Sequence, residues 1–582
     1  MEKRYSDEKH VQILVSLLKQ HGISRVIASP GTTNSGFVTS LKYDGSFKIY
    51  SSVDERSAAY LACGLAAESG EPVVITCTGA TASRNYMPGL TEAFYRKLPV
   101  LAVTGAQHYS KIGHHVAQVI DRTVVPNDVA KLSLSLPVVK DDTDRWDCEI
   151  KVNRAILELK RNGGGPAHLN LPTTYTHEYT TTTLPDYRKI DRVLSDSTFP
   201  VLDPGKRVAV FVGAHAAWSD AATTALDAFC STNNAVVFCD HTSAYRGRYR
   251  VQYALAAGQS SYTIAKASRP DVLIHIGEIS GDYASLSIRG TEVWRVSLDG
   301  ELRDTFGTLT YVFEMSETAF FEKYTRSVRT DDAYLHFCQK RYREIYERIP
   351  GLPFSNIWVA SVMADKIPGN SAIHFGILNS LRSWNYFELP GSVSSASNVG
   401  GFGIDGGLSS VIGASLYNPG KLYFCVIGDL AFFYDINVLG NRHVGKNVRI
   451  LLINNGKGTE FRHFNHYAAQ FGEAADEYIA AAGHFGNKSK DLVKSFVTNL
   501  GYTYLSAATK DEFMLAYPQF VDPQMQEAPV VFEVFTDSAE ESKALELIVG
   551  IDEGETLDKA KQFAKKIVGE RTFGIMKKML KK

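Results

Sequence analysis

The sequence predicts an α/β protein of several domains, each a mainly parallel sheet flanked by helices. Three observations lead to this fold class. The chain has 582 residues, more than a single hydrophobic core usually serves, and 44% of them are hydrophobic. Short apolar runs alternate with longer amphipathic runs, which is typical of parallel strands joined by helices. Several short runs end in small, turn-forming residues, as strands do at the ligand-binding edge of such sheets.

Residues 1–185 are expected to form the first domain. It begins with a helical run over 10–20. Its strands are predicted at 25–28, 47–51, 72–78 and 100–104. Gly79 and Gly105 follow the last two strands and are therefore expected at the carboxyl edge of the sheet. An uneven, threonine-rich stretch over 173–183 is expected to be a linker.

Two further domains are expected, a central α/β domain over 186–350 and a third domain over 351–540. The central strands are predicted at 207–212, 235–239, 272–276 and 293–296, and strands of the third domain at 421–427 and 448–454. The charged segment 541–582 is predicted to be a C-terminal helical tail. The first and third domains are similar in size and alternation, as expected for a duplicated module.

Composition and charge exclude several classes of protein. The chain carries 62 basic and 63 acidic residues, a balance that argues against nucleic acid or an anionic membrane as a partner. Its seven scattered cysteines fit neither a disulfide framework nor a zinc site. The charged first ten residues lack the core of a signal peptide, and no run approaches the roughly 18 apolar residues that span a bilayer. We therefore expect a cytoplasmic protein.

The most informative motif lies in the third domain, where two neighbouring strands are followed by polar turns. Asp429 and Asn455 stand just after these strands. A carboxylate and an amide oxygen are ligands that suit Mg²⁺, and the helix that starts at Asp429 offers backbone N–H groups to a phosphate. Either turn alone would be ordinary turn chemistry, but the combined spacing predicts a metal-bridged diphosphate site.

On this motif the chain resembles the thiamine diphosphate-dependent enzymes, the family of the 2-oxo acid decarboxylases and acetolactate synthases, and within it the menaquinone-pathway synthases most closely. The resemblance implies a three-domain architecture, with a pyrimidine-binding (PYR) domain first and a diphosphate-binding (PP) domain third. It implies thiamine diphosphate and Mg²⁺ as cofactors. The side chains of Asp429 and Asn455 and the backbone carbonyl of Lys457 would be the metal ligands.

The resemblance assigns the activating role to Glu55, which follows the second predicted strand. Its carboxylate would hydrogen-bond the aminopyrimidine ring of the cofactor and favour the tautomer that activates the thiazolium ring. The alternative is a carboxylate that only complements a helix dipole. In this family the glutamate reaches cofactor held by another subunit, so a homodimer or homotetramer with active sites at subunit interfaces is implied.

Ile404 lies in a glycine-rich run over 397–407 and resembles the apolar residue that holds this cofactor bent. An ordinary core isoleucine is the alternative. The other cofactor-binding residues that the resemblance implies are Gly31, Thr78, Asn379, Ser380, Gly403, Gly428, Leu430, Ala431 and Thr459.

The substrate is expected to differ from that of the menaquinone-pathway branch. Thr33, Gln107 and Val399 stand where the resemblance predicts carboxylate-binding arginines. Each lost charge-assisted bond costs about 1.5 to 3 kcal/mol of binding. Arg382 and Arg84 are candidates to replace them. The candidate substrate residues are Thr33, Gln107, His108, Arg382, Phe461, Arg462 and His463.

Three further residues are candidate catalytic groups, besides Glu55. Gln118 matches a glutamine that family members direct at the substrate, and His114 and His115 resemble the histidine pair of pyruvate-type decarboxylases. Solvated loop histidines are the alternative.

The reaction that we expect is carboligation by a transferase or lyase, in which a small-molecule 2-oxo acid donor is decarboxylated and joined to a carbonyl acceptor. Simple, non-oxidative 2-oxo acid decarboxylation and a non-catalytic, cofactor-binding regulatory protein are the alternatives. All three share the same cofactor machinery.

Overall fold

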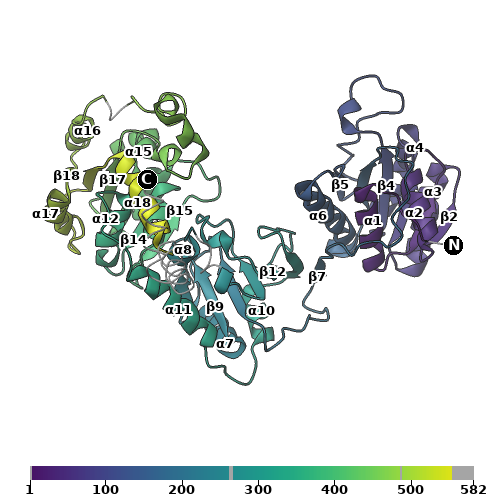
Figure 1. Cartoon of the computed structure of the whole chain (residues 1–582), viewed down its shortest axis with the longest axis horizontal. Helices are drawn as coiled ribbons and strands as arrows, with labels where there is room; N and C mark the ends of the chain where they lie inside the picture. Colours follow the sequence, from purple (N-terminus) through teal and green to yellow (C-terminus); the bar gives the residue numbers. More distant parts are fainter. Residues whose placement is uncertain (1–2, 261–265, 485–487, 553–582) are drawn as a thin grey trace, which may run out of the picture. The chain divides into compact units, whose positions relative to one another are not determined.

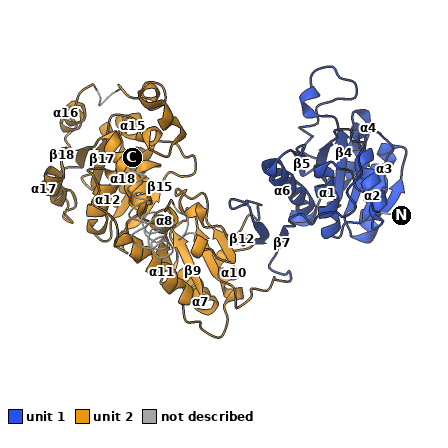
Figure 2. Ribbon diagram, in the orientation of Figure 1, with its two compact units in different colours: residues 1–198, 300–314 blue, residues 199–299, 315–582 orange. Residues whose placement is uncertain are grey.

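The computed structural model describes residues 3–260, 266–484 and 488–552, and the chain forms two compact units (Figures 1 and 2). Unit 1 comprises residues 1–198 and 300–314, and unit 2 comprises 199–299 and 315–582. The part of the predicted tail beyond residue 552 lies outside the described residues.

Unit 1 is built on a six-stranded parallel sheet with the strand order β2-β1-β3-β4-β6-β5. Its strands are β1 (Arg25–Ala28), β2 (Lys48–Ser51), β3 (Val73–Cys77), β4 (Val100–Ala106), β5 (Leu132–Ser135) and β6 (Ala167–Pro172). Its helices are α1 (Lys9–Gln20), α2 (Ser35–Asp44), α3 (Glu55–Ser69), α4 (Thr81–Asn85), α5 (Met87–Tyr95) and α6 (Asp142–Glu158). This order reverses direction at β1 and β3, which is where open parallel sheets place their ligands.

Helices cover both faces of this sheet. Successive residues of a strand point to opposite faces, so neighbouring side chains pack in different cores. Val26 packs in a core with residues of α1, α2 and α6, whereas its neighbour Ile27 packs in a second core with residues of α3 and α5. Both faces are therefore buried, and β3 and β4 are apolar along most of their length, as expected for a parallel sheet covered on both sides.

Residues 300–314 belong to unit 1, although the sequence places them in the central domain. Strand β13 (Leu309–Glu314) pairs in parallel with β7 (Asp191–Val193). Ion pairs reinforce this contact: Arg188 lies 2.6 Å from Asp304, and Arg192 lies 3.4 Å from Glu314. These long-range pairings have no local sequence signature, so sequence periodicity could not reveal them.

The first part of unit 2 carries parallel strands in the order β10-β9-β8-β11-β12. These strands are β8 (Val208–Val212), β9 (Ala235–Cys239), β10 (Arg250–Gln252), β11 (Val272–Ile276) and β12 (Glu292–Ser297). The helices around them are α7 (Asp220–Asn233), α8 (Ala254–Ala257), α10 (Glu317–Tyr324) and α11 (Ala333–Tyr346).

The second part of unit 2 is a six-stranded parallel sheet with the order β15-β14-β16-β17-β19-β18. Its strands are β14 (Ala372–Phe375), β15 (Ser394–Ser397), β16 (Tyr423–Gly428), β17 (Val448–Asn454), β18 (Thr503–Ala507) and β19 (Val530–Phe535). Its helices are α12 (Asn356–Met363), α13 (Asn379–Asn385), α14 (Gly407–Tyr417), α15 (Asp429–Tyr434), α16 (Leu492–Asn499), α17 (Lys510–Phe520) and α18 (Ser538–Val549).

The three mainly parallel sheets with flanking helices confirm the predicted fold class. Among the described residues, no helix combines the length and the apolar character needed to cross a membrane. The seven cysteines are all buried and free.

Candidate active site

Strands β16 and β17 bring Asp429 and Asn455 to the same edge of the third sheet. The two strands are parallel neighbours, with Gly428 opposite Ile453. Asp429 is the first residue of α15, directly after β16, and Asn455 directly follows β17. The crossover topology thus places a carboxylate and an amide from two turns side by side, as the spacing predicts.

The Asp429 carboxylate is buried and held in a fixed orientation. Only 5% of the residue is exposed, and its two oxygens accept hydrogen bonds from the backbone N–H groups of Gly456 (2.7 Å) and Leu430 (2.9 Å). Burial raises the pKa of Asp429 to about 6, and these hydrogen bonds only partly oppose it. A bound cation would favour the charged form of this carboxyl group, so the site suits a metal ion.

Asn455 supplies an oxygen that the fold itself leaves unused. Its Oδ1 atom is buried and has no hydrogen-bond partner among the described residues. Buried polar atoms are nearly always bonded, so an orphan oxygen near a buried carboxylate indicates a missing ligand. With the Lys457 carbonyl, which the resemblance implies as a third ligand, these oxygens would make an all-oxygen donor set of the kind that suits Mg²⁺.

A cavity of about 170 Å³ opens beside these residues. Its wall includes Ile404, which is half-buried, as a residue that touches a ligand would be and unlike a fully buried core isoleucine. Of the cofactor and metal residues predicted in unit 2, those that line the cavity are Asn379, Ser380, Ile404, Gly428, Asp429, Leu430, Ala431, Asn455, Lys457 and Thr459. Gly403 does not line it.

Two candidate substrate residues of unit 2, Arg382 and His463, contact residues that line this cavity. Arg382 is paired with Glu460, which also lines the cavity, and is therefore already neutralised. The Nε2 atom of His463 lies 2.8 Å from the Asn379 side-chain amide. Burial lowers the pKa of His463 to about 4, so its imidazole is neutral near pH 7.

Phe461 lines the cavity itself, whereas Arg462 is directed elsewhere. The Nε atom of Arg462 lies 3.6 Å from Asp476. Asp476 also accepts a hydrogen bond of 2.7 Å from the Lys457 side chain. The two basic side chains thus anchor the segment around Asp476, while Lys457 also lines the cavity.

Glu55 is the first residue of α3 in unit 1. The preceding Asp54 caps this helix by accepting hydrogen bonds from Arg56 N (3.1 Å) and Ser57 Oγ (2.7 Å). Glu55 is half-buried, and its carboxylate makes no hydrogen bond to another residue in the described ranges. Because Asp54 caps the helix, Glu55 remains available to a ligand.

Thr33 and Thr78 join two turns at the carboxyl edge of the unit 1 sheet. Their hydroxyls lie 2.8 Å apart, and Thr33 also accepts a hydrogen bond of 3.1 Å from Gly79 N. A Cβ atom on Gly31 would lie 2.4 Å from the Thr78 Cβ, so only glycine fits there. Thr33 is 5% exposed and orders this edge rather than facing solvent.

The loop after β4 carries the other candidates of unit 1. Gln107 donates to the Ala117 carbonyl (3.2 Å), and His108 and Ser110 lie 2.8 Å apart. Gln118, with a φ of 61°, lines a separate pocket of unit 1 together with Gln107. The described loop exposes both His114 and His115 to solvent.

Three cavity residues carry no motif that sequence analysis could have used. Glu541 in α18 is 5% exposed and accepts a hydrogen bond of 2.9 Å from Asn356 N, yet it falls in the segment predicted as a tail. Glu460 is recognised only through its pairing with Arg382. Leu378 has a φ of 60°, and strained backbone of this kind concentrates at functional sites.

Comparison with known protein families identifies one domain. Residues 9–124 match the family model described as "Thiamine pyrophosphate enzyme, N-terminal TPP binding domain". This range covers β1 to β4 of unit 1 and includes both Glu55 and Gln118. The match lies in the domain that the resemblance identifies as the pyrimidine-binding domain.

Curated relatives extend the similarity over nearly the whole chain. The chain is similar to enzymes named 2-succinyl-5-enolpyruvyl-6-hydroxy-3-cyclohexene-1-carboxylate synthase. The relative from Bacteroides fragilis is 29% identical over 568 residues, covering 93% of this chain and 98% of the relative. That from Flavobacterium psychrophilum is 26% identical over 536 residues (84% and 93%), and that from Desulfotalea psychrophila 25% identical over 561 residues (91% and 98%). The chain thus carries a thiamine pyrophosphate enzyme N-terminal TPP binding domain, has a fold of three parallel sheets, and is similar over nearly its whole length to these synthases.

Proposed function

We propose that the chain is a thiamine diphosphate- and Mg²⁺-dependent carboligase that takes a 2-oxo acid as donor and a second carbonyl compound as acceptor. The observation that carries this proposal is the cavity beside Asp429 and the unpartnered Oδ1 of Asn455. The relatives are synthases by name, which favours bond formation over simple cleavage. We assign the PYR domain to 1–185, the central domain to 186–350 and the PP domain to 351–540.

In this proposal the PP domain holds the cofactor. Asp429, Asn455 and the Lys457 carbonyl would hold Mg²⁺, and the backbone N–H groups at the start of α15 would offer hydrogen bonds to the diphosphate. Ile404, which lines the cavity wall, would contact the cofactor and hold it in place. Thiamine diphosphate, when bound, supplies the carbon nucleophile that adds to the 2-oxo group and stabilises the charge left when CO₂ departs.

The chain's own residues bind, orient and move protons around that chemistry. The Glu55 carboxylate, which Asp54 leaves free, accepts and returns a proton at the aminopyrimidine ring. Gln118 orients the substrate by hydrogen bonding, with His114 and His115 on the same loop. Neutral His463 offers a hydrogen bond rather than a charge at the cavity wall. Glu55 serves cofactor held by a second copy of the chain, so the active form is a homodimer or homotetramer.

The substrate differs from that of the named relatives in its number of carboxylates. Thr33 and Val399 are each 5% exposed, and the Thr33 hydroxyl is bonded inside the fold. Arg382 is neutralised by Glu460, and Arg84 is an exposed residue that donates to the Asp121 carbonyl (2.9 Å). With these positions unable to clamp carboxylates, a donor or acceptor with fewer acid groups fits better.

Simple decarboxylation is the second candidate, favoured by His114 and His115, since solvent-exposed histidines can deliver a proton in place of an acceptor. A panel of 2-oxo acids, each supplied with and without aldehyde acceptors to Mg²⁺- and cofactor-loaded enzyme, separates the two. A carboligase gives a ligated product and releases CO₂ faster with an acceptor. Equal CO₂ release with free aldehyde as the product would support the decarboxylase instead.

A further inference from the structure

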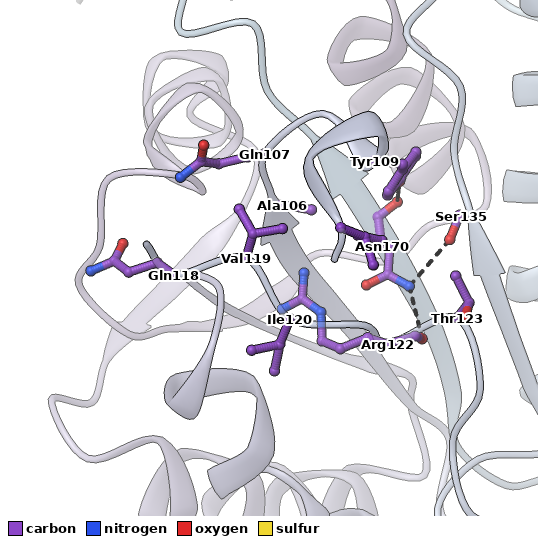
Figure 3. Close-up of a pocket in the computed structure, with 11 residues that line it drawn as sticks. Ala106, Gln107, Tyr109, Gln118, Val119, Ile120, Arg122, Thr123, Ser135 and Asn170 are labelled. Atoms are coloured by element: carbon purple, nitrogen blue, oxygen red, sulfur yellow. Dashed lines mark hydrogen bonds between the residues drawn. The ribbon is translucent and has the colours of Figure 1, made fainter. Parts of the chain in front are cut away.

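A second pocket lies in unit 1, between the end of β4 and the loop that follows it (Figure 3). Its volume is about 20 Å³, which leaves room for one small polar group rather than for a whole substrate molecule. Gln107, Tyr109 and Gln118 line it from this loop, and Asn170 lines it from β6. The pocket therefore sits at the carboxyl edge of the sheet, where parallel sheets bind ligands.

Arg122 is the one ionised side chain in the lining of this pocket. The residue is only 6% exposed, and Figure 3 shows its side chain extending from the backbone toward the middle of the lining residues. Its Nη2 atom donates a hydrogen bond of 2.8 Å to the Gly105 carbonyl. The Nε and Nη1 atoms are buried and have no hydrogen-bond partner among the described residues.

No carboxylate in the part of the chain that the structure describes neutralises Arg122. The adjacent Asp121 is exposed and its carboxylate accepts from the backbone N–H of Thr123 (2.9 Å). Burial and, to a lesser degree, the charge of Arg84 lower the pKa of Arg122, but a guanidinium stays charged in proteins. A buried, unpaired charge destabilises the folded chain. An anion that binds beside the Arg122 guanidinium would therefore stabilise the folded protein.

The geometry favours a carboxylate as that anion. A guanidinium edge presents two parallel N–H donors that match the two oxygens of a carboxylate. The surrounding groups are neutral and largely engaged: Tyr109 Oη donates to the Asn170 carbonyl (3.0 Å), and Asn170 Nδ2 lies 3.3 Å from Ser135 Oγ. The side-chain amide of Gln118 lines the same pocket and can bond a second polar group of the ligand, whereas that of Gln107 already bonds the Ala117 carbonyl and Lys111.

We propose that this pocket binds the carboxylate of the substrate, with Arg122 as the residue that holds it. Where the proposal names the ligand as a 2-oxo acid, it rests on the proposed function. Arg122 then supplies a carboxylate clamp in a chain that has Thr33, Gln107 and Val399 at the three positions expected to carry arginine. No sequence pattern indicates this role for Arg122, because an Asp-Arg pair in a loop usually faces solvent.

Equilibrium binding to the full-length protein without thiamine diphosphate tests the site on its own. Pyruvate, acetate and inorganic phosphate are titrated separately by calorimetry at constant ionic strength. Pyruvate is expected to bind, and Arg122→Gln to weaken it at least about tenfold. Arg145→Gln, an equal charge change on the exposed face of α6, should leave binding unchanged. Absence of pyruvate binding, tighter binding of phosphate, or an unaffected Arg122→Gln variant would overturn the proposal.

Three further measurements distinguish loss of the site from misfolding and from a carboxylate site outside the active site. Arg122→Gln should unfold at or above the wild-type temperature, because it removes an unpaired buried charge. Arg122→Lys retains charge without the planar fork, and should also bind pyruvate more weakly. In the cofactor-loaded enzyme Arg122→Gln should raise KM for the 2-oxo acid more than it lowers kcat. Unchanged KM with lost pyruvate binding would make the site a regulatory one and contradict the substrate assignment, while cofactor uptake tests the proposed function separately.

Discussion

Arg382 forms a bidentate ion pair with Glu460, which lines the cavity beside Asp429. Arg382 Nη1 donates to Glu460 Oε2 (2.9 Å), and Nη2 donates to Oε1 (2.8 Å). Less than a quarter of either side chain is exposed. The pair joins α13 to the turn after β17, so it fixes two of the segments that form the cavity.

Breaking this pair should destabilise the fold more than removing it altogether. Arg382→Met leaves the Glu460 carboxylate buried without its partner, which costs about 3 to 5 kcal/mol for buried pairs of this kind. The Arg382→Met/Glu460→Gln double variant should recover much of that loss. Urea denaturation of the wild type and the two variants measures both effects. Equal stability of wild type and single variant would show that the pair contributes nothing to the fold.

The same pair predicts a pH dependence. Burial alone would raise the pKa of Glu460, but the hydrogen bonds and charge of Arg382 outweigh it and hold the pKa below the ordinary 4.5. The stability that this group contributes is therefore complete above pH 4.5 and lost as the pH falls through the lowered pKa. The deficit of Arg382→Met relative to wild type should shrink in acid. A deficit that grows below pH 4.5 would contradict this sign.

Glu541 predicts the opposite trend with pH. Burial raises its pKa from 4.5 to about 7, although Thr536 and the Asn356 N–H partly oppose the shift. A carboxyl group with a raised pKa contributes stability that is complete below pH 4.5 and lost as the pH rises through 7. Glu541→Gln, which is neutral at every pH, should thus gain stability relative to wild type between pH 5 and pH 8. Chemical denaturation at those two pH values provides the measurement, and a constant difference would refute it.

Two inactive variants should restore activity in a mixed assembly if Glu55 serves cofactor held by a second subunit. Glu55→Gln and Asp429→Asn each remove one half of the site. A dimer that contains one of each keeps one site with both groups intact, so random mixing should restore about a quarter of wild-type activity. Co-expression of two differently tagged chains provides the mixed dimer. Persistent inactivity of a purified mixed dimer would place both groups in the same chain's site.

Much of the fold could be predicted from the sequence because it depends on local periodicity. The strand at 25–28 and the strand at 448–454 were predicted with their observed bounds, since each is a short apolar run that ends in a turn. Residues 300–314 could not be placed, because their position depends on pairing of β13 with β7 and on ion pairs between distant segments. Such contacts leave no periodic pattern.

The residues of the candidate site also fall into those that the sequence could predict and those that it could not. Asp429 and Asn455 follow adjacent parallel strands, so a rule about sheet edges was enough to bring them together. Arg122 and Glu541 have no such signal. Arg122 stands out because its guanidinium is buried without a counter-charge, and Glu541 because its carboxylate is buried against Asn356. Burial depends on the tertiary fold, which the sequence alone does not show. The sequence also could not show that Arg382 is already paired with Glu460.

The most direct test of the account is a calorimetric titration of the purified, full-length protein with thiamine diphosphate in the presence of Mg²⁺. We expect saturable uptake that EDTA abolishes and that Asp429→Asn weakens at least about tenfold. Asp365→Asn, the same charge change at an exposed position, should bind like the wild type. If the Mg²⁺-replete wild type took up no cofactor, or if Asp429→Asn bound it undiminished, the metal-bridged site at the end of β16 would be wrong.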